Sequence, residues 1–146
     1  MGVPLANEPQ TRLSFARKLA LGVEIFAAYA RARWLLQRGD VPAAVQILRS
    51  VAPSVGVHGR DARAEQLIGL RLGRAVVCVL GLLPSDSRCL VRSLVLTRLL
   101  ARRGIPSSLV IGVASGPAFA AHAWVETGDV PLLSAHEPHY ARLVRL

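Results

Sequence analysis

The most regular helical pattern in the sequence is RCLVRSLVLTRLLARR, which spans residues 88–103. Its apolar residues recur every three or four positions, as expected for an amphipathic helix packed on a core. Arginines lie on the other side, and the glycine that follows is a common helix end. We therefore predict a helix over 88–103. Its apolar face consists of Leu90, Val91, Leu94, Val95, Leu99 and Leu100.

On the C-terminal side of this helix the hydrophobic period changes. Short apolar runs at 109–113, 119–127 and 130–133 predict three strands. Gly128 and Asp129, between the second and third runs, predict a hairpin turn. Helices followed by a small antiparallel sheet are typical of the α+β class, which is the fold class that we predict.

On the N-terminal side the pattern predicts three more helices, over residues 11–37, 40–51 and 61–80. Asp40 and Asp61 are suitable N-cap residues for the second and third of these. In the first helix one apolar stripe keeps a spacing of three to four, and the arginines lie off it. This stripe consists of Leu13, Ala16, Ala20, Val23, Ala27, Ala30 and Trp34.

The composition indicates one compact unit. The chain has 146 residues, of which 52% are hydrophobic and 18% charged, enough apolar surface to form a real core. Within this unit we expect a helical N-terminal region, 1–81, and a core region, 82–146. The longest uncharged stretch, 104–125, is interrupted by glycines and prolines and does not predict a membrane helix. The first ten residues show no signal-peptide pattern, so we expect a cytoplasmic protein.

Cys89 is the candidate nucleophile. It lies in the first turn of the helix over 88–103, where unpaired backbone N–H groups and the helix dipole favour an anion such as a thiolate. A dipole alone does little, so a reactive thiolate also requires a partner such as an imidazolium. His122 lies in the predicted strand 119–127 and could supply it, sharing one side of that strand with Trp124 and Glu126. Spacing alone also fits an ordinary core cysteine and an ordinary hydrogen-bonded histidine.

The other cysteine and histidines carry weaker signals. Cys78 lies in the apolar run VVCVL, so we predict a buried and unreactive thiol. Two cysteines in a cytosolic chain do not indicate a disulfide. His136 and His139 lack a second ligand pair at a suitable spacing, which argues against zinc, and we expect no metal or cofactor. His58 lies in a glycine-flanked loop and is expected to be solvated.

Four ordered blocks resemble a known family. They are CLVRSL at 89–94, RGIP at 103–106, LVIGV at 109–113 and AHAWVE at 121–126. In this order and at these separations they resemble the transglutaminase-like leader peptidases of lasso-peptide biosynthesis. The resemblance covers residues 82 to about 140, and the preceding helices resemble that family's N-terminal part more loosely.

The resemblance implies a papain-like cysteine peptidase of the bacterial cytoplasm that removes the leader from a ribosomally made precursor peptide. In such an enzyme Cys89 would attack the scissile carbonyl and His122 would protonate the leaving amine. Backbone N–H groups at the helix start could form the oxyanion hole. The family's leader-binding module is absent from this sequence. The resemblance therefore implies a separate small leader-recognition protein and an ATP-using cyclase as partners.

The third residue of the catalytic triad is where the sequence departs from the family. The family usually has an acidic residue about a dozen positions beyond the histidine, and Ser134 occupies that position here. Glu137 is our preferred substitute, on the assumption of a small insertion. Asp129, at the predicted turn, is the alternative. A backbone carbonyl could also hold His122 in place of an acid.

Two other functions compete with peptidase activity. The formal net charge is +9, and all but one of the 18 basic residues are arginine, which would suit a nucleic-acid-binding helical protein. The arginines are spread along the whole chain without an aromatic platform or a binding motif, so we expect no nucleic-acid partner. A transglutaminase-like fold could also serve only as a scaffold for the cyclase.

Overall fold

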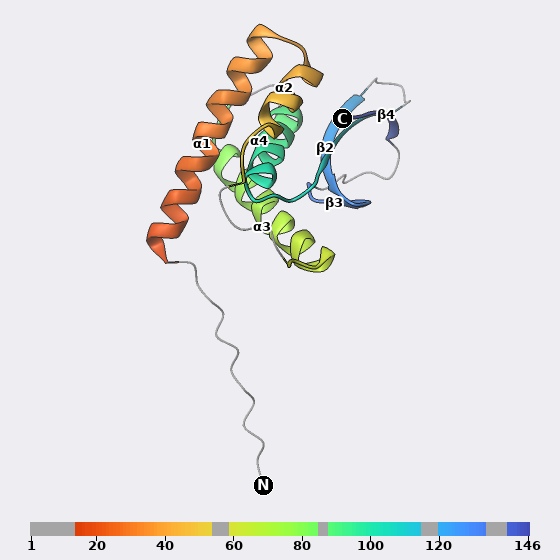
Figure 1. The fold of residues 1–146 in the computed structure, drawn as a ribbon. Coiled ribbons are helices and arrows are strands. Elements are labelled where there is room, and N and C mark those ends of the chain that lie inside the picture. The colour runs from red at the N-terminus through yellow and green to blue at the C-terminus, as the bar shows by residue number, and fades with distance from the viewer. Residues whose placement is uncertain (1–13, 54–58, 85–87, 115–119, 134–139) are drawn as a thin grey trace.

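The computed structural model describes residues 14–53, 59–84, 88–114, 120–133 and 140–146. Within these residues four helices precede a four-stranded antiparallel sheet, which confirms the predicted α+β class (Figure 1). The helices are α1 (Phe15–Arg38), α2 (Val41–Arg49), α3 (Ala62–Leu80) and α4 (Arg88–Arg102). The strands are β1 (Ser108–Ala114), β2 (Ala120–Thr127), β3 (Val130–Pro131) and β4 (Ala141–Arg145).

Two aspartates start α2 and α3 as predicted. The Oδ1 atom of Asp40 accepts a hydrogen bond of 2.9 Å from the backbone N–H of Ala43. Asp61 does the same for the N–H of Ala64, at 2.7 Å. Each side chain satisfies an N–H group that has no partner within its helix, and so defines where that helix begins.

Helix α4 forms the centre of the molecule. It lies between the helical layer of α1 and the sheet in Figure 1, and it packs against α1, α2, α3 and β2. Because neighbours cover it on several sides, even its polar residues Ser93 and Thr97 are buried. The predicted apolar face is confirmed, since all of its members are buried except Leu90, which is half-buried.

The sheet has the strand order β3-β2-β1-β4. β1 and β2 pair along their full length, from Ser108 opposite Glu126 to Ala114 opposite Ala120. β3 pairs only with the last two residues of β2, so described strands leave most of the other edge of β2 unpaired. β4, which the sequence analysis missed, pairs with β1. Every residue of β4 is exposed, so no buried alternating pattern marks it in the sequence.

The apolar stripe predicted for the first helix is not the face that packs on the core. The buried residues of α1 are Ile25, Ala28, Ala32 and Leu35. Of the predicted stripe, all the members that the structure describes, from Ala16 to Trp34, are exposed. Because α1 carries apolar residues on two opposite sides, hydrophobic periodicity could not tell which side would be buried.

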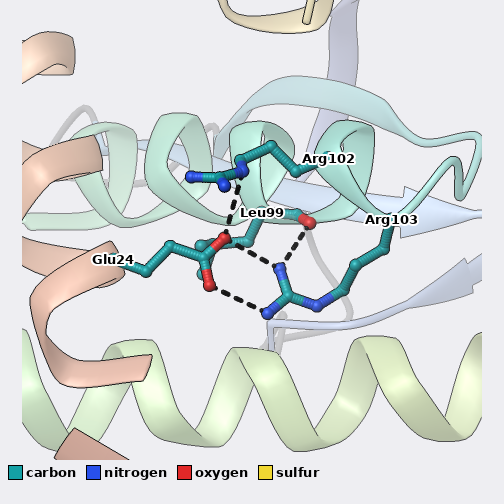
Figure 2. A network of polar contacts seen from close by, with 4 residues as sticks. All are labelled: Glu24, Leu99, Arg102 and Arg103. Atoms are coloured by element: carbon teal, nitrogen blue, oxygen red, sulfur yellow. Dashed lines mark hydrogen bonds and ion pairs between the residues drawn. The ribbon is translucent and has the colours of Figure 1, made fainter. Parts of the chain in front are cut away.

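A carboxylate and two guanidinium groups connect α1 with the C-terminal end of α4 (Figure 2). Glu24 of α1 accepts two hydrogen bonds from Arg103, of 3.1 and 2.9 Å, and its Oε1 lies 3.5 Å from Nε of Arg102. Arg103 also donates a 2.9 Å hydrogen bond to the carbonyl of Leu99. The Arg103 guanidinium therefore satisfies a carbonyl in the last turn of α4 and holds α1 against that helix.

Candidate active site

Cys89 is the second residue of α4, as predicted. Its thiol is free and its side chain is half-buried. A residue in the first helical turn lies beside backbone N–H groups that have no partner within the helix. Such groups can donate hydrogen bonds to an anion, whether a thiolate or the oxyanion of an attacked carbonyl.

His122 lies near the start of β2, on the sheet face turned away from the helices. Leu109 and Val125, opposite each other in β1 and β2, belong to the core that the helices form. Side chains alternate along a strand, so His122 and Trp124 lie on the other face. Their rings stack with centroids 6.0 Å apart, and the ring of Tyr140 lies 5.3 Å from that of His122.

Ser93 links α4 to β2, one helical turn beyond Cys89. Its hydroxyl donates a 3.1 Å hydrogen bond to the backbone carbonyl of Ala123. The carbonyl of Val125, two residues further along β2, accepts a hydrogen bond from the N–H of Leu132. This bond lies at the edge of β2 that is not paired with β1. Carbonyls two residues apart on a strand point to the same edge. At Ala123 the Ser93 hydroxyl therefore takes the place of the N–H group that a neighbouring strand would supply.

This contact brings Cys89 and His122 to one end of the molecule. The link from α4 to β1 has only five residues, 103–107, and β2 is antiparallel to β1, so β2 runs in the same general direction as α4. Cys89 lies four residues before Ser93, about 6 Å back along the helix. Ala121 lies two residues before Ala123, about 6.6 Å back along the strand, and His122 follows it.

The two side chains nevertheless do not meet. Among the residues that the structure describes, the Cys89 thiol and the His122 ring make no hydrogen bond, with each other or with another group. The imidazole lies against Trp124 and Tyr140 instead. The structure thus joins α4 to β2 at Ser93 and Ala123, and it shows no contact between the two reactive groups.

A buried carboxylate holds Trp124 in place. Glu126 is only 2% exposed, and its Oε1 accepts hydrogen bonds from Nε1 of Trp124, at 2.8 Å, and from Arg142 of β4, at 2.9 Å. This confirms the predicted common side of His122, Trp124 and Glu126. The indole passes so close to Gly112 that a Cβ there would lie 2.9 Å from it. Sequence reasoning missed Arg142 because it missed β4.

One comparison with known proteins identifies the family of the chain. A model of the transglutaminase-like superfamily matches residues 20–145, which is most of the chain. The chain belongs to the transglutaminase-like superfamily. No curated protein and no solved structure matches it significantly. This superfamily includes cysteine peptidases, so a cysteine at a helix start beside a histidine-bearing strand is in keeping with the family. The matched span crosses the predicted boundary at residue 81, as does the buried core.

Glu137, the preferred third residue of the predicted triad, lies outside the described residues, as does Ser134. The alternative, Asp129, is described and lies at the opposite end of β2 from His122. Five strand residues, about 16 Å, separate His122 from the end of β2 that precedes the turn. The Asp129 side chain is 91% exposed and lies 3.8 Å from Arg145, so it does not orient the His122 ring.

The prediction for Cys78 is wrong. Its side chain is exposed, whereas Val76 and Leu80 of the same apolar run are buried. α3 packs on the core through one stripe of residues only. Residue 78 is two positions from each of Val76 and Leu80, so its side chain points to the opposite side of the helix. The sequence run is apolar on all sides, so it gave no sign of this.

The remaining predictions about ligands and membranes concern other parts of the chain. His58, His136 and His139 lie outside the described residues. In the part of the chain that the structure describes, no group of three or more potential metal-binding side chains comes together. None of the described helices is both long enough and apolar enough to cross a bilayer.

Proposed function

We propose that this protein is a cysteine peptidase that removes the leader from a ribosomally synthesised lasso-peptide precursor. The observation that carries the proposal is the link between Cys89 and the strand of His122. Cys89 lies in the first turn of α4, and Ser93 in the next turn donates a hydrogen bond to the carbonyl of Ala123, the residue after His122. Membership of a superfamily that includes cysteine peptidases supports it, and so do the four sequence blocks described above.

In the proposed reaction the Cys89 thiolate attacks the scissile carbonyl carbon and the C–N bond breaks. His122, as imidazolium, gives its proton to the leaving amine. The resulting thioester is then hydrolysed by water, from which His122 takes a proton. Backbone N–H groups in the first turn of α4 stabilise the oxyanion. Glu137 is the proposed orienting acid. No cofactor takes part in this chemistry.

The reaction requires the imidazole to approach the sulfur within hydrogen-bond distance. Described strands leave the edge of β2 at this position unpaired, and β2 contacts α4 there through Ser93. Because the backbone sets the direction of the Cα–Cβ bond, a change of rotamer alone leaves the ring on its own face of the sheet. The proposal therefore requires a twist of the first residues of β2 that turns His122 toward α4. Such contacts commonly tighten only when substrate binds.

The proposal includes two partners besides the precursor. A separate small leader-recognition protein would present the leader, and an ATP-using cyclase would close the ring of the released core peptide. Neither nucleic acid nor a membrane is part of the proposal. The two competing functions, nucleic-acid binding and a scaffold without catalysis, predict different results in the same experiment.

The test is cleavage of a cognate precursor, incubated with this chain and its leader-recognition protein and followed by mass spectrometry. We expect Cys89→Ala and His122→Ala to lower the rate on the order of 10³-fold or more, because each removes a reacting group. Cys78→Ala is the matched control, since it removes the exposed thiol and should retain full activity. Circular dichroism checks that all variants are folded.

Full cleavage by Cys89→Ala would rule out the peptidase mechanism. Cleavage that persists while cyclisation is lost would favour the scaffold function. Salt-sensitive binding of DNA, with no cleavage by the wild-type chain, would favour nucleic-acid binding.

A further inference from the structure

The outer side of α1 is an apolar surface that none of the other described residues covers. Large side chains line it at helical spacing, and each is well exposed. They are Phe15 (82%), Leu19 (60%), Val23 (64%), Phe26 (48%) and Trp34 (41%). We call these five residues the α1 outer face. By helical position it lies opposite the buried stripe of α1, and α1 itself lies at the outside of the molecule in Figure 1.

The large and small residues of the α1 outer face are arranged as on a surface that packs against another helix. Leu19, Gly22, Val23 and Phe26 stand at positions i, i+3, i+4 and i+7, the four corners of a hole that receives one side chain of a facing helix. The floor of this hole is empty, because no atom other than those of the adjoining residues and the helix's own backbone lies within 4 Å of where a Cβ of Gly22 would be. Small and large residues therefore alternate as in an interdigitating helix pair.

Positive charge surrounds this face. α1 carries five basic residues and one acidic residue, and the acidic one, Glu24, is turned toward Arg102 and Arg103. Lys18 and Arg33 border the face on one side by their helical positions, and Arg31 and Arg38 border it on the other. Both of these last two arginines lie over the Trp34 ring, at 5.1 and 4.3 Å from its centroid.

The basic field extends onto α4. Burial, together with the like charges of Arg102 and Arg31, lowers the pKa of Arg98, and Glu24 only partly opposes this. Arg31, which borders the α1 outer face, is thus close enough to act on a guanidinium of α4.

We propose that the α1 outer face docks an acidic amphipathic helix of a partner protein. The apolar side of that helix would fill the hole over Gly22 and the neighbouring holes, and its flanking Glu or Asp residues would pair with the arginines and the lysine of α1. A Trp between two arginines at one end is the kind of residue that commonly anchors such an interface.

The charge and the shape of the α1 outer face favour an acidic helix over a second copy of this chain and over a membrane surface. In a second copy of this chain, the basic borders of two α1 helices would face each other, which costs free energy. A helix that lies in a membrane surface usually presents a broad unbroken apolar side. Here Gly22 and Ala30 interrupt the large side chains, and Arg33 stands in line with Phe15 and Phe26. The proposal does not depend on the peptidase function, because Cys89 lies in another helix.

The test uses the full chain and a synthetic three-heptad peptide with Leu at positions a and d and Glu at e and g, labelled with a fluorophore. The glutamates keep the free peptide from pairing with itself. We expect saturable binding by fluorescence anisotropy that weakens with added salt. A peptide with Lys in place of Glu, and one of the same composition in scrambled order, should not bind. Cys89→Ala should bind as the wild type does.

Two variants probe the surface. Leu19→Gln with Phe26→Gln should raise the Kd about tenfold or more, because large apolar contacts dominate such interfaces. Gly22→Leu is the sharper variant. It adds apolar surface and has room in the free protein, yet it fills the hole and should also raise the Kd. Leu82→Gln with Leu143→Gln is the matched control, since both leucines are well exposed outside α1 and their replacement should leave the Kd unchanged.

Any of four results would overturn the proposal. The first is that the acidic peptide fails to bind. The second is that Gly22→Leu binds the peptide as tightly as the wild type does, or more tightly. The third and fourth concern other occupants of the face. The chain sediments as a dimer that Leu19→Gln with Phe26→Gln disperses, which would show that a second copy covers the face. The chain binds phosphatidylglycerol vesicles through the α1 outer face and not the peptide, which would show a membrane-surface helix.

Discussion

Ser93 shows how one hydroxyl connects the two halves of the candidate site. It is fully buried on α4, and its Oγ donates to the carbonyl of Ala123 at the edge of β2. Thr97, one turn later, donates instead to the carbonyl of Ser93 within its own helix. Of these two hydroxyls on α4, only that of Ser93 reaches the strand that carries His122.

Replacing Ser93 by Ala should destabilise the protein. The change leaves the Ala123 carbonyl without its partner, which costs about 1–3 kcal/mol for a buried group. Ser50→Ala is the matched control, because Ser50 also donates to a backbone carbonyl, that of Ile47, but in an exposed position. Urea unfolding of the two variants measures the difference. Equal losses of stability would show that the Ser93 bond has no special role.

The same substitution bears on catalysis. Ser93→Ala removes the hydrogen bond that helps to fix the position of β2 along α4. Precursor cleavage should therefore slow even under conditions where the variant is fully folded. An unchanged cleavage rate would mean that other contacts position His122.

At the scale of elements, two helical glycines have opposite surroundings. Gly73 of α3 lies against the chain after β3, where a Cβ would lie 2.6 Å from the carbonyl oxygen of Leu132. Gly22 of α1 has open space around it. The first glycine permits a close approach between α3 and the sheet, whereas the second only lowers helix propensity in the free protein.

Alanine at these two positions should therefore change stability in opposite directions. Gly73→Ala forces backbone apart and should cost about 1–3 kcal/mol. Gly22→Ala should raise the free energy of unfolding by at most about 1 kcal/mol. Chemical denaturation of both variants provides the comparison. A Gly73→Ala variant that loses no stability would contradict the described packing of α3 on Leu132, and a loss in Gly22→Ala would contradict the open space at Gly22.

The contact between α1 and α4 rests partly on Glu24. Glu24→Gln removes the charge that pairs with Arg103 and Arg102 and should lower stability by about 1 kcal/mol, since these groups are partly exposed and screened by solvent. The loss should shrink at high salt. Asp129→Asn is the control, because the Asp129 carboxylate is almost fully exposed and 3.8 Å from its arginine. A thermal unfolding series in salt measures both, and a loss for Glu24→Gln that salt does not reduce would exclude an electrostatic origin.

At the scale of the whole molecule, one core joins the N-terminal helices to the sheet. Buried residues from α1, α2, α3, α4, β1 and β2 belong to the same cluster. The candidate site and the α1 outer face are on different sides of α4, because β2 covers one side of that helix and α1 covers another. A partner docked on α1 would thus leave the start of β2 accessible to a substrate.

Much of this architecture was predictable because its causes are local. The helix starts at Asp40 and Asp61 depend on hydrogen bonds to residues three positions away, so the sequence contains all that is needed. The position of Cys89 at a helix start and the common side of His122 and Trp124 follow from the helical and strand periods in the same way.

Other features depended on the packing between distant segments. The sequence of α1 is apolar on two sides, and only contact with α4 chose Ile25 and its neighbours over the α1 outer face. Cys78 is exposed because α3 packs through another stripe, and β4 forms only because β1 offers it an edge. Residues a few positions apart set where a helix begins and which side chains share a face. Burial of a face depends on elements far away in the chain, and only the tertiary structure supplies them.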